Sequence, residues 1–144
     1  MDDWKGHRRI SLEIVLTKNQ KKVLVNHAQS NFPNESCALL FGIGDSKTCT
    51  VKDIFLAENM EKSPINFTIS NEELLKGYKE AEQKKLDVIG IFHSHPHSEA
   101  VPSLTDKEFM VGNPVVWMIF SNKRDEFKAY ILESSLVQVS IKII

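Results

Sequence analysis

The chain contains 144 residues, of which 42% are apolar and 26% are charged, and this composition is ordinary for a globular protein. The length suits one compact domain over 1–144 and excludes a (β/α)₈ barrel, which needs about 250 residues. A net charge of −1 leaves no basic excess for binding nucleic acid or an anionic membrane. No apolar stretch reaches the ~20 residues that cross a bilayer, and two cysteines make no disulfide framework. We therefore expect a soluble, cytoplasmic domain.

Apolar runs bounded by turn residues predict the strands. Such runs occur, in chain order, over 10–16, 36–42, 48–56, 65–69, 87–95, 115–120, 126–132 and 136–143. The turn Gly44-Asp45-Ser46 joins the second run to the third, which predicts a β-hairpin. Residues 1–8 are polar, and we expect a loose terminus there.

Capping signals and helical spacing predict three helices between these strands. They are expected over 18–32, 71–85 and 104–111, and the first two begin with the capping-box pairs Thr17–Gln20 and Ser70–Glu73. Strand-rich segments interleaved with two long helices and one short helix predict an α+β or mixed α/β architecture.

The segment 92–106 (FHSHPHSEAVPSLTD) carries three of the five histidines of the chain. His93 and His95 are two residues apart at the end of a predicted strand, so both side chains project from one face, about 7 Å apart. Two imidazoles at that separation can both bind the same metal ion, each at ~2.0–2.1 Å. A catalytic zinc usually takes three protein ligands, and Asp106 is the best third ligand by position, because the loop after Pro96 can fold it back.

Several of these residues also have interpretations that involve no metal. Ser103 and Asp106 have the spacing of a helix-capping pair. His97 is either a third ligand instead of Asp106 or a loop histidine, and we favour the loop. Glu35 taken alone is typical of an exposed turn carboxylate. Cys37 is more typical of a buried small hydrophobe than of a redox or metal residue.

Taken as a whole, the sequence resembles the JAMM (MPN+) metalloprotease family, whose domain is also called JAB. The family signature combines an upstream Glu with His-Ser/Thr-His-Pro, followed by Ser, two residues and Asp. The matching residues are Glu35, His93-Ser94-His95-Pro96, Ser103 and Asp106, with ten residues between the second His and the Asp. Residues 33–42 also resemble the entry strand of the family, except for Ala38 where Gly is common.

The resemblance implies a single JAB/MPN+ domain over 1–144 with the cytidine-deaminase-like JAB/MPN fold. This fold is α+β, with a central, mostly antiparallel, curved sheet flanked by two long helices and one short helix. The resemblance also implies one Zn²⁺ per chain, held by His93, His95 and Asp106. Glu35 matches the general acid/base, and Ser103 matches the residue that hydrogen-bonds the tetrahedral oxyanion.

The implied function is that of a zinc-dependent isopeptidase, a metalloprotease that removes ubiquitin or a ubiquitin-like or small archaeal modifier from protein lysines. A metal-activated water would attack the bond. The compact chain looks closer to prokaryotic and archaeal members than to the large eukaryotic ones. The alternatives are release of an amino acid such as cysteine from the C-terminus of a sulfur-carrier protein, and a non-catalytic scaffold. A proteasome-linked or sulfur-carrier pathway and a homo-oligomer both stay open.

Overall fold

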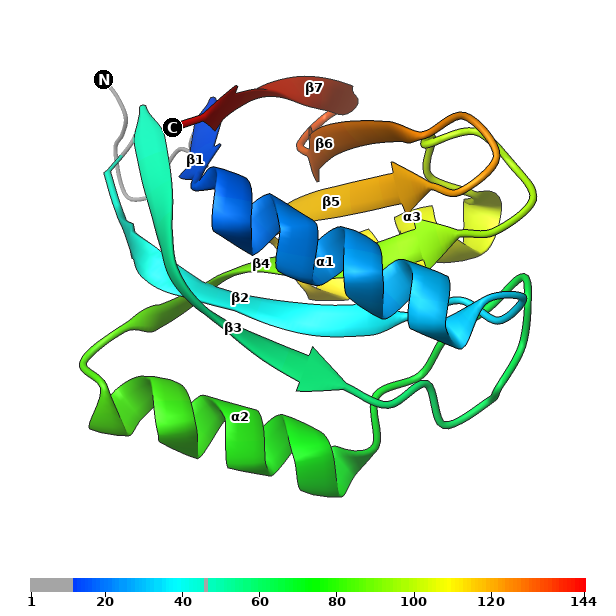
Figure 1. Ribbon diagram of the computed structural model, residues 1–144. Helices are drawn as coiled ribbons and strands as arrows, with labels where there is room; N and C mark the ends of the chain where they lie inside the picture. The colour runs from blue at the N-terminus through cyan, green and yellow to red at the C-terminus, as the bar shows by residue number, and fades with distance from the viewer. Residues whose placement is uncertain (1–11, 46) are drawn as a thin grey trace.

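The structure is a computed structural model that describes residues 12–45 and 47–144 (Figure 1). The elements along the chain are β1 (Glu13–Leu16), α1 (Lys18–Asn31), β2 (Cys37–Gly44), β3 (Thr48–Ala57), α2 (Asn71–Gln83), β4 (Asp87–His95), α3 (Leu104–Gly112), β5 (Val116–Ser121), β6 (Glu126–Leu132) and β7 (Leu136–Ile143). The predicted loose terminus 1–8 and the first two residues of the predicted strand 10–16 lie outside the described residues. Within the described part, no helix has the length and apolar character to cross a membrane.

The seven strands form one closed barrel in the order β1-β3-β2-β4-β5-β6-β7. The short β1 closes it, because it pairs in parallel with β3 on one side and with β7 on the other. This corrects the expected curved sheet, whereas the mixed α/β class is confirmed. The hairpin prediction is also confirmed, since β2 and β3 pair antiparallel from Cys37–Ala57 to Gly44–Cys49. Four of the seven strand pairs are antiparallel.

Of the three helices in the described residues, α1 and α3 begin with complete capping boxes. In α1 the Thr17 hydroxyl accepts from the Gln20 backbone N–H, and the Gln20 side chain accepts from the Thr17 N–H in return. Before α2, Ser70 accepts from the Glu73 N–H at 3.1 Å, but the reciprocal bond is missing. The Glu73 carboxylate instead accepts from the Glu58 N–H at 2.9 Å, so the predicted second box is only half formed.

The predicted strand 65–69 is wrong, because these residues belong to an irregular segment between β3 and α2. Residues 65–69 form hydrogen bonds with other residues of this segment rather than in a strand ladder. The Met60 N–H donates to the Thr68 carbonyl at 2.9 Å, and the Thr68 N–H donates to Asn59 Oδ1 at 3.2 Å. The alternating Ile65, Phe67 and Ile69 thus mimic a strand in sequence without pairing with one.

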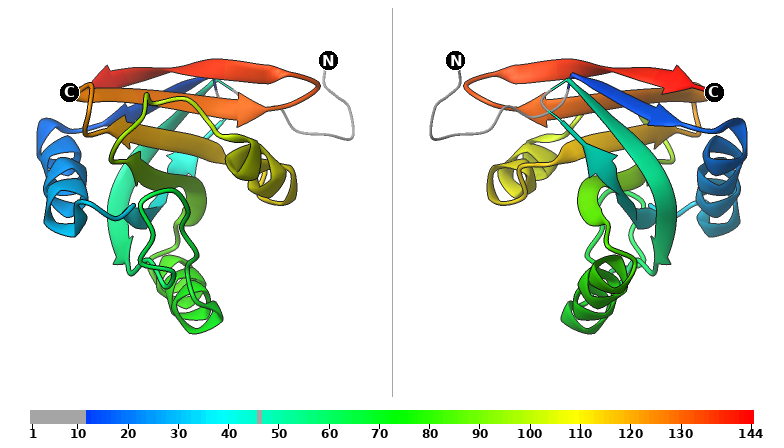
Figure 2. Two further views of the ribbon diagram at one scale, coloured as in Figure 1. Left: turned by 90° about the vertical axis from the view of Figure 1, so that its right-hand side faces the viewer. Right: turned by 90° about the vertical axis from the view of Figure 1, so that its left-hand side faces the viewer.

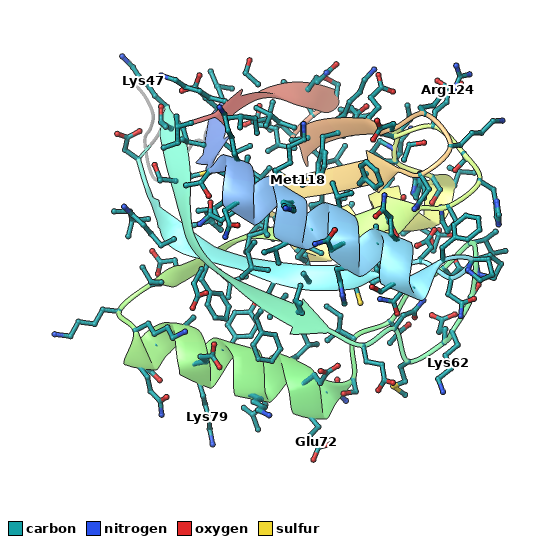
Figure 3. All side chains as sticks on the ribbon, in the orientation of Figure 1. Lys47, Lys62, Glu72, Lys79, Met118 and Arg124 are labelled. Atoms are coloured by element: carbon teal, nitrogen blue, oxygen red, sulfur yellow. The ribbon has the colours of Figure 1, made fainter. Side chains whose placement is uncertain are left out.

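The helices lie on two sides of the barrel (Figures 1 and 2). Leu24 and Ala28 of α1 lie in one apolar cluster with Met118 of β5, which is labelled in Figure 3. Ala81 of α2 and Met110 of α3 pack in the second cluster. In Figure 3, Glu72 and Lys79 point from α2 away from the barrel. Ile91 of β4 belongs to the second cluster, so the period of two places the side chains at 93 and 95 on the same side.

Candidate metal centre

The C-terminal end of strand β4 places His93 and His95 side by side in the protein interior. Their Nε2 atoms lie 3.0 Å apart, and the residues are 0% and 5% exposed. Flanking strands fix this geometry, because His93 is in register with Cys37 of β2 and His95 with Ser121 of β5. The same-face arrangement predicted from the spacing is confirmed.

Asp106 reaches the histidine pair from the first turn of α3. Its Oδ2 atom lies 3.2 Å from Nε2 of His93 and 3.1 Å from Nε2 of His95. The same oxygen accepts a hydrogen bond from the Ser103 backbone N–H at 2.9 Å. The capping pair and the metal-ligand geometry therefore coexist in one carboxylate, and the helix cap orients it toward the histidines.

The three side chains fit a divalent metal ion such as zinc. One nitrogen or oxygen from each lies within 4.8 Å of the others, and all three residues are buried. Tetrahedral zinc with bonds of ~2.0–2.1 Å separates its ligand atoms by about 3.3 Å, close to the distances between these atoms. The His95 Nδ1–H donates to the Glu99 carbonyl at 2.8 Å when its Nε2 lone pair faces the cluster, which is the usual support for a metal-binding histidine.

The protein environment keeps the cluster ready for a cation. Burial raises the pKa of Asp106, but hydrogen bonds to both histidines outweigh it and hold the pKa well below its usual range. Burial lowers the pKa of His93. Burial also lowers the pKa of His95, but hydrogen bonds to Asp106 and to the Glu99 carbonyl raise it overall. An ionised carboxylate beside two imidazoles would exchange bound protons for a metal ion.

Glu35 lies beside this cluster although it is 58 positions from His93 in the sequence. It is 3% exposed, and its Oε1 atom is buried with no hydrogen-bond partner among the described residues. Burial raises the pKa of Glu35 to about 8; the charge of His95 lowers it and that of Asp106 raises it. The pairing of β2 with β4 brings it there, and the Ser36 N–H fixes the approach by donating to Ser94 Oγ at 2.8 Å.

The remaining residues singled out in the sequence take simpler places. Ser103 is exposed, and its Oγ accepts from the Asp106 N–H at 3.0 Å. Its O–H group can therefore donate a hydrogen bond to a bound substrate. His97 lies outside the cluster, exposed and edge-on to Phe32 at 5.3 Å, which confirms the loop interpretation. Cys37 is fully buried, and burial raises the pKa of its thiol to about 12, which favours its interpretation as a small hydrophobe.

Phe67 is a site residue that the sequence analysis missed. Its ring stacks on the His93 ring at 4.7 Å between centroids, while Trp117 meets the same imidazole edge-on at 5.8 Å. Both aromatic residues also line a cleft of about 170 Å³ between α2 and α3. The other residues along this cleft are Thr68, Ile69, Leu74, Ile91, Phe109 and Asn113. The apolar alternation around Phe67 was the available signal, and it was read as a strand.

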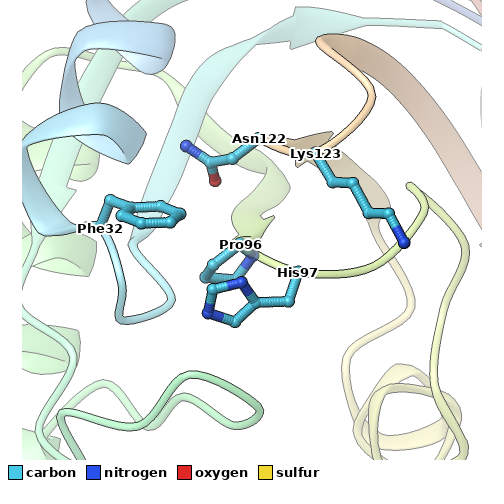
Figure 4. Close-up of a pocket in the computed structure, with 5 residues that line it drawn as sticks. All are labelled: Phe32, Pro96, His97, Asn122 and Lys123. Carbon is cyan, nitrogen blue, oxygen red and sulfur yellow. The ribbon is translucent and has the colours of Figure 1, made fainter.

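A second cavity, of about 460 Å³, lies where β4 and β5 end (Figure 4). Its lining residues are Phe32, Pro96, His97, Asn122 and Lys123. The Asn122 N–H donates to the carbonyl of His95 at 3.1 Å, so this cavity borders the backbone of a candidate ligand.

A barrel with helices on both sides and a buried His-His-Asp cluster at the end of β4 is the arrangement expected of a JAB-type metal-binding domain. A family profile described as prokaryotic homologs of the JAB domain matches residues 17–132. The chain therefore belongs to the JAB (JAMM/MPN+) domain family.

Individual relatives support this membership. The chain is 40% identical over 110 residues to a desampylase of Pyrococcus furiosus, covering 76% of this chain and 75% of that protein. It is 25% identical over 135 residues to a CysO-cysteine peptidase of Mycobacterium tuberculosis, covering 91% of each chain. The solution structure of protein DSY2949 from Desulfitobacterium hafniense superimposes with a TM-score of 0.82 at 29% identity, covering 91% of this chain and 92% of that one.

Proposed function

We propose that this chain is a zinc-dependent isopeptidase that removes a small ubiquitin-like modifier from protein lysines. The observation that carries the proposal is the combination of a buried metal-ligand set with the adjacent carboxylate of Glu35, whose buried Oε1 has no hydrogen-bond partner in the described part of the chain. The similarity to a desampylase supports a small archaeal modifier as the substrate class. A non-catalytic scaffold is disfavoured by the complete set of Glu35, His93, His95 and Asp106.

His93, His95 and Asp106 would hold the metal, which supplies a Lewis acid and lowers the pKa of a bound water toward about 7. Glu35 takes the proton of the attacking water and delivers it to the leaving lysine amine. The Ser103 hydroxyl donates a hydrogen bond to the oxyanion that develops at the scissile carbonyl. The bond broken is the amide between the C-terminal carbonyl of the modifier and the lysine Nζ. The products are a modifier carboxylate and a free lysine side chain.

The cleft beside Phe67 and Trp117 supports binding of an extended tail. It is largely apolar, and two of its lining residues, Phe67 and Trp117, also contact the ring of His93, so a chain lying in it would run close to the cluster. Because the cleft is already formed, binding of an extended tail would require little ordering of the protein itself.

The direct test of this proposal is to incubate the purified protein with modifier–protein conjugates in the presence and absence of a chelator. We expect release of intact modifier and a free target lysine, abolished by the chelator and restored by added zinc, with mass spectrometry identifying both products. Magnesium added instead of zinc is the control, because His-rich sites favour zinc over magnesium. Cleavage that persists through chelation would contradict the proposal.

Release of an amino acid from the C-terminus of a sulfur-carrier protein is the second candidate. Similarity to a CysO-cysteine peptidase over 91% of the chain favours it, since this match extends further than the one to the desampylase. Both reactions use the same metal centre and differ only in what leaves. A carrier protein bearing a C-terminal cysteine, assayed beside a lysine conjugate, separates them: free cysteine identifies the second reaction and a free lysine side chain the first.

A further inference from the structure

Asn59 is a buried polar residue that neither the candidate metal centre nor the cleft contains. It is 4% exposed and lies in the irregular segment 58–69 between β3 and α2. Its amide makes five contacts with main-chain atoms: Nδ2 donates to the carbonyls of Glu35 (3.1 Å), Asn66 (3.0 Å) and Ser63 (3.5 Å), and Oδ1 accepts from the N–H groups of Glu61 (3.0 Å) and Thr68 (3.2 Å). All of its polar capacity serves the segment and one residue outside it.

The residue outside the segment is Glu35. Asn59 binds its carbonyl, and the Glu35 N–H donates to the Ser63 carbonyl at 2.8 Å, so both backbone groups of Glu35 are held by the 58–69 segment. The next residue, Ser36, is held by Ser94 of β4. Glu35 is therefore fixed between the ligand-bearing strand on one side and a loop organised by Asn59 on the other.

The same amide also controls the position of Phe67. Asn59 bonds to the carbonyl of Asn66 and to the N–H of Thr68, the two neighbours of Phe67 in the chain. The Phe67 ring then stacks on His93 and lines the cleft. One side chain thus ties together the backbone at the base of the site and the aromatic wall of the cleft.

We propose that Asn59 is a positioning residue that holds Glu35 and Phe67 at the metal centre. The inference deepens the proposed function and rests on it. An asparagine suits the task because it offers two donors and an acceptor on a short stem. Aspartate at this position would point acceptors at three carbonyls, and alanine would remove the hydrogen bonds that Asn59 makes to those carbonyls and to two N–H groups.

Amide hydrogen exchange tests the structural half without any assay of activity. In N59A the N–H groups of Glu35 and Thr68 should exchange at least ~10-fold faster than in the wild type. The Ser36 N–H, which bonds to Ser94, should change little because it is anchored by β4. Unchanged exchange at Glu35 and Thr68 would overturn the inference, whatever the enzyme cleaves.

Kinetics test the catalytic half, with Gln20→Ala as the matched control. Gln20 also bonds main chain with both ends of its amide, to the Thr17 N–H and the Val51 carbonyl, at the far end of α1. We expect N59A to lower kcat by about 10-fold or more and to raise KM, with zinc content unchanged, because a misplacement of ~1 Å costs up to ~10²-fold. Q20A should lose stability but keep kcat and KM.

A double-mutant cycle shows whether Asn59 acts through Glu35. In the E35Q background, N59A should have little further effect on kcat, because the group that it positions no longer takes a proton. An equal loss of kcat in both backgrounds, or an unchanged kcat in N59A despite faster exchange, would reduce Asn59 to a purely structural residue. If the wild type cleaves no conjugate at all, the proposed function fails, and the exchange data still decide whether Asn59 holds Glu35.

Discussion

The Glu35 carboxyl is buried beside the candidate metal centre, so its charge state depends on whether that centre holds a metal ion. In the protein stripped of metal, burial raises the pKa of Glu35 from 4.5 to about 8. A bound divalent cation would act in the opposite direction, because it favours the ionised carboxylate. The same residue would then be ready to accept a proton near neutral pH.

This shift predicts a pH dependence of stability for the metal-free protein. Between pH 4.5 and about 8 the unfolded chain loses the Glu35 proton while the folded protein keeps it. The stability contributed by this residue is therefore present below pH 4.5 and falls as the pH rises toward 8. Because Glu35→Gln has no proton to lose, its free energy of unfolding relative to the wild type should increase across this window. Urea unfolding of the two chelated proteins measures it, and a constant difference would contradict the shifted pKa.

Ser103 combines a structural contact with a proposed catalytic one. Its oxygen caps α3, and its proton is available for an oxyanion. We predict that Ser103→Ala lowers kcat by roughly 10²-fold with a smaller change in KM, since the bond would strengthen only in the transition state. Loss of the cap alone would cost ~1 kcal/mol of stability and leave kcat nearly intact. Thermal melts and steady-state kinetics on the same protein distinguish the two roles.

The histidines of segment 92–106 provide a matched pair for the metal site. His93→Ala should remove most of the zinc, because it leaves two ligands, whereas His97→Ala should retain one zinc per chain. Elemental analysis of both purified variants measures this. Zinc should also raise the melting temperature of the wild type, by an amount that grows with the free zinc concentration relative to Kd. It should not raise the melting temperature of H93A. Full zinc occupancy in H93A would contradict the ligand assignment.

At the scale of elements, we predict that the cleft between α2 and α3 contributes to substrate binding. Phe109 lines the cleft from α3, while Val111 lies on the same helix, is 73% exposed and does not line it. Phe109→Ala should raise KM several-fold with kcat retained, because it removes apolar contact area that binds ground state and transition state alike. Val111→Ala is the control. Equal kinetics for both variants would place the tail elsewhere.

The elements that build the site were largely predictable from the sequence. The period of two in β4 places His93 and His95 on one face, and the capping pair Ser103–Asp106 marks the start of α3. The segment 65–69 was not predictable, because an apolar alternation has the same pattern whether it pairs as a strand or packs Phe67 against a histidine. The role of Asn59 carries no sequence signal, since a buried asparagine in a polar loop looks like any turn residue.

At the scale of the whole molecule, closure of the barrel could not be predicted. The alternation of β1 is visible in sequence, but its two parallel partners, β3 and β7, come from opposite halves of the chain. Closure leaves none of the strands in the described residues as a free edge, which removes a route to edge-to-edge association. Within the barrel, antiparallel pairing holds the start of β2 beside the end of β4, and this brings Glu35 to the histidines.

Glu35→Gln tests the central claim most directly, because it keeps the size and hydrogen bonding of the side chain but cannot take a proton from water. The variant should retain one zinc per chain and wild-type stability at acidic pH. Its rate of conjugate cleavage should fall by at least the ~10²–10⁴-fold typical of general acid–base catalysis, while conjugates still bind. A cleavage rate close to that of the wild type, at full zinc occupancy, would contradict the account.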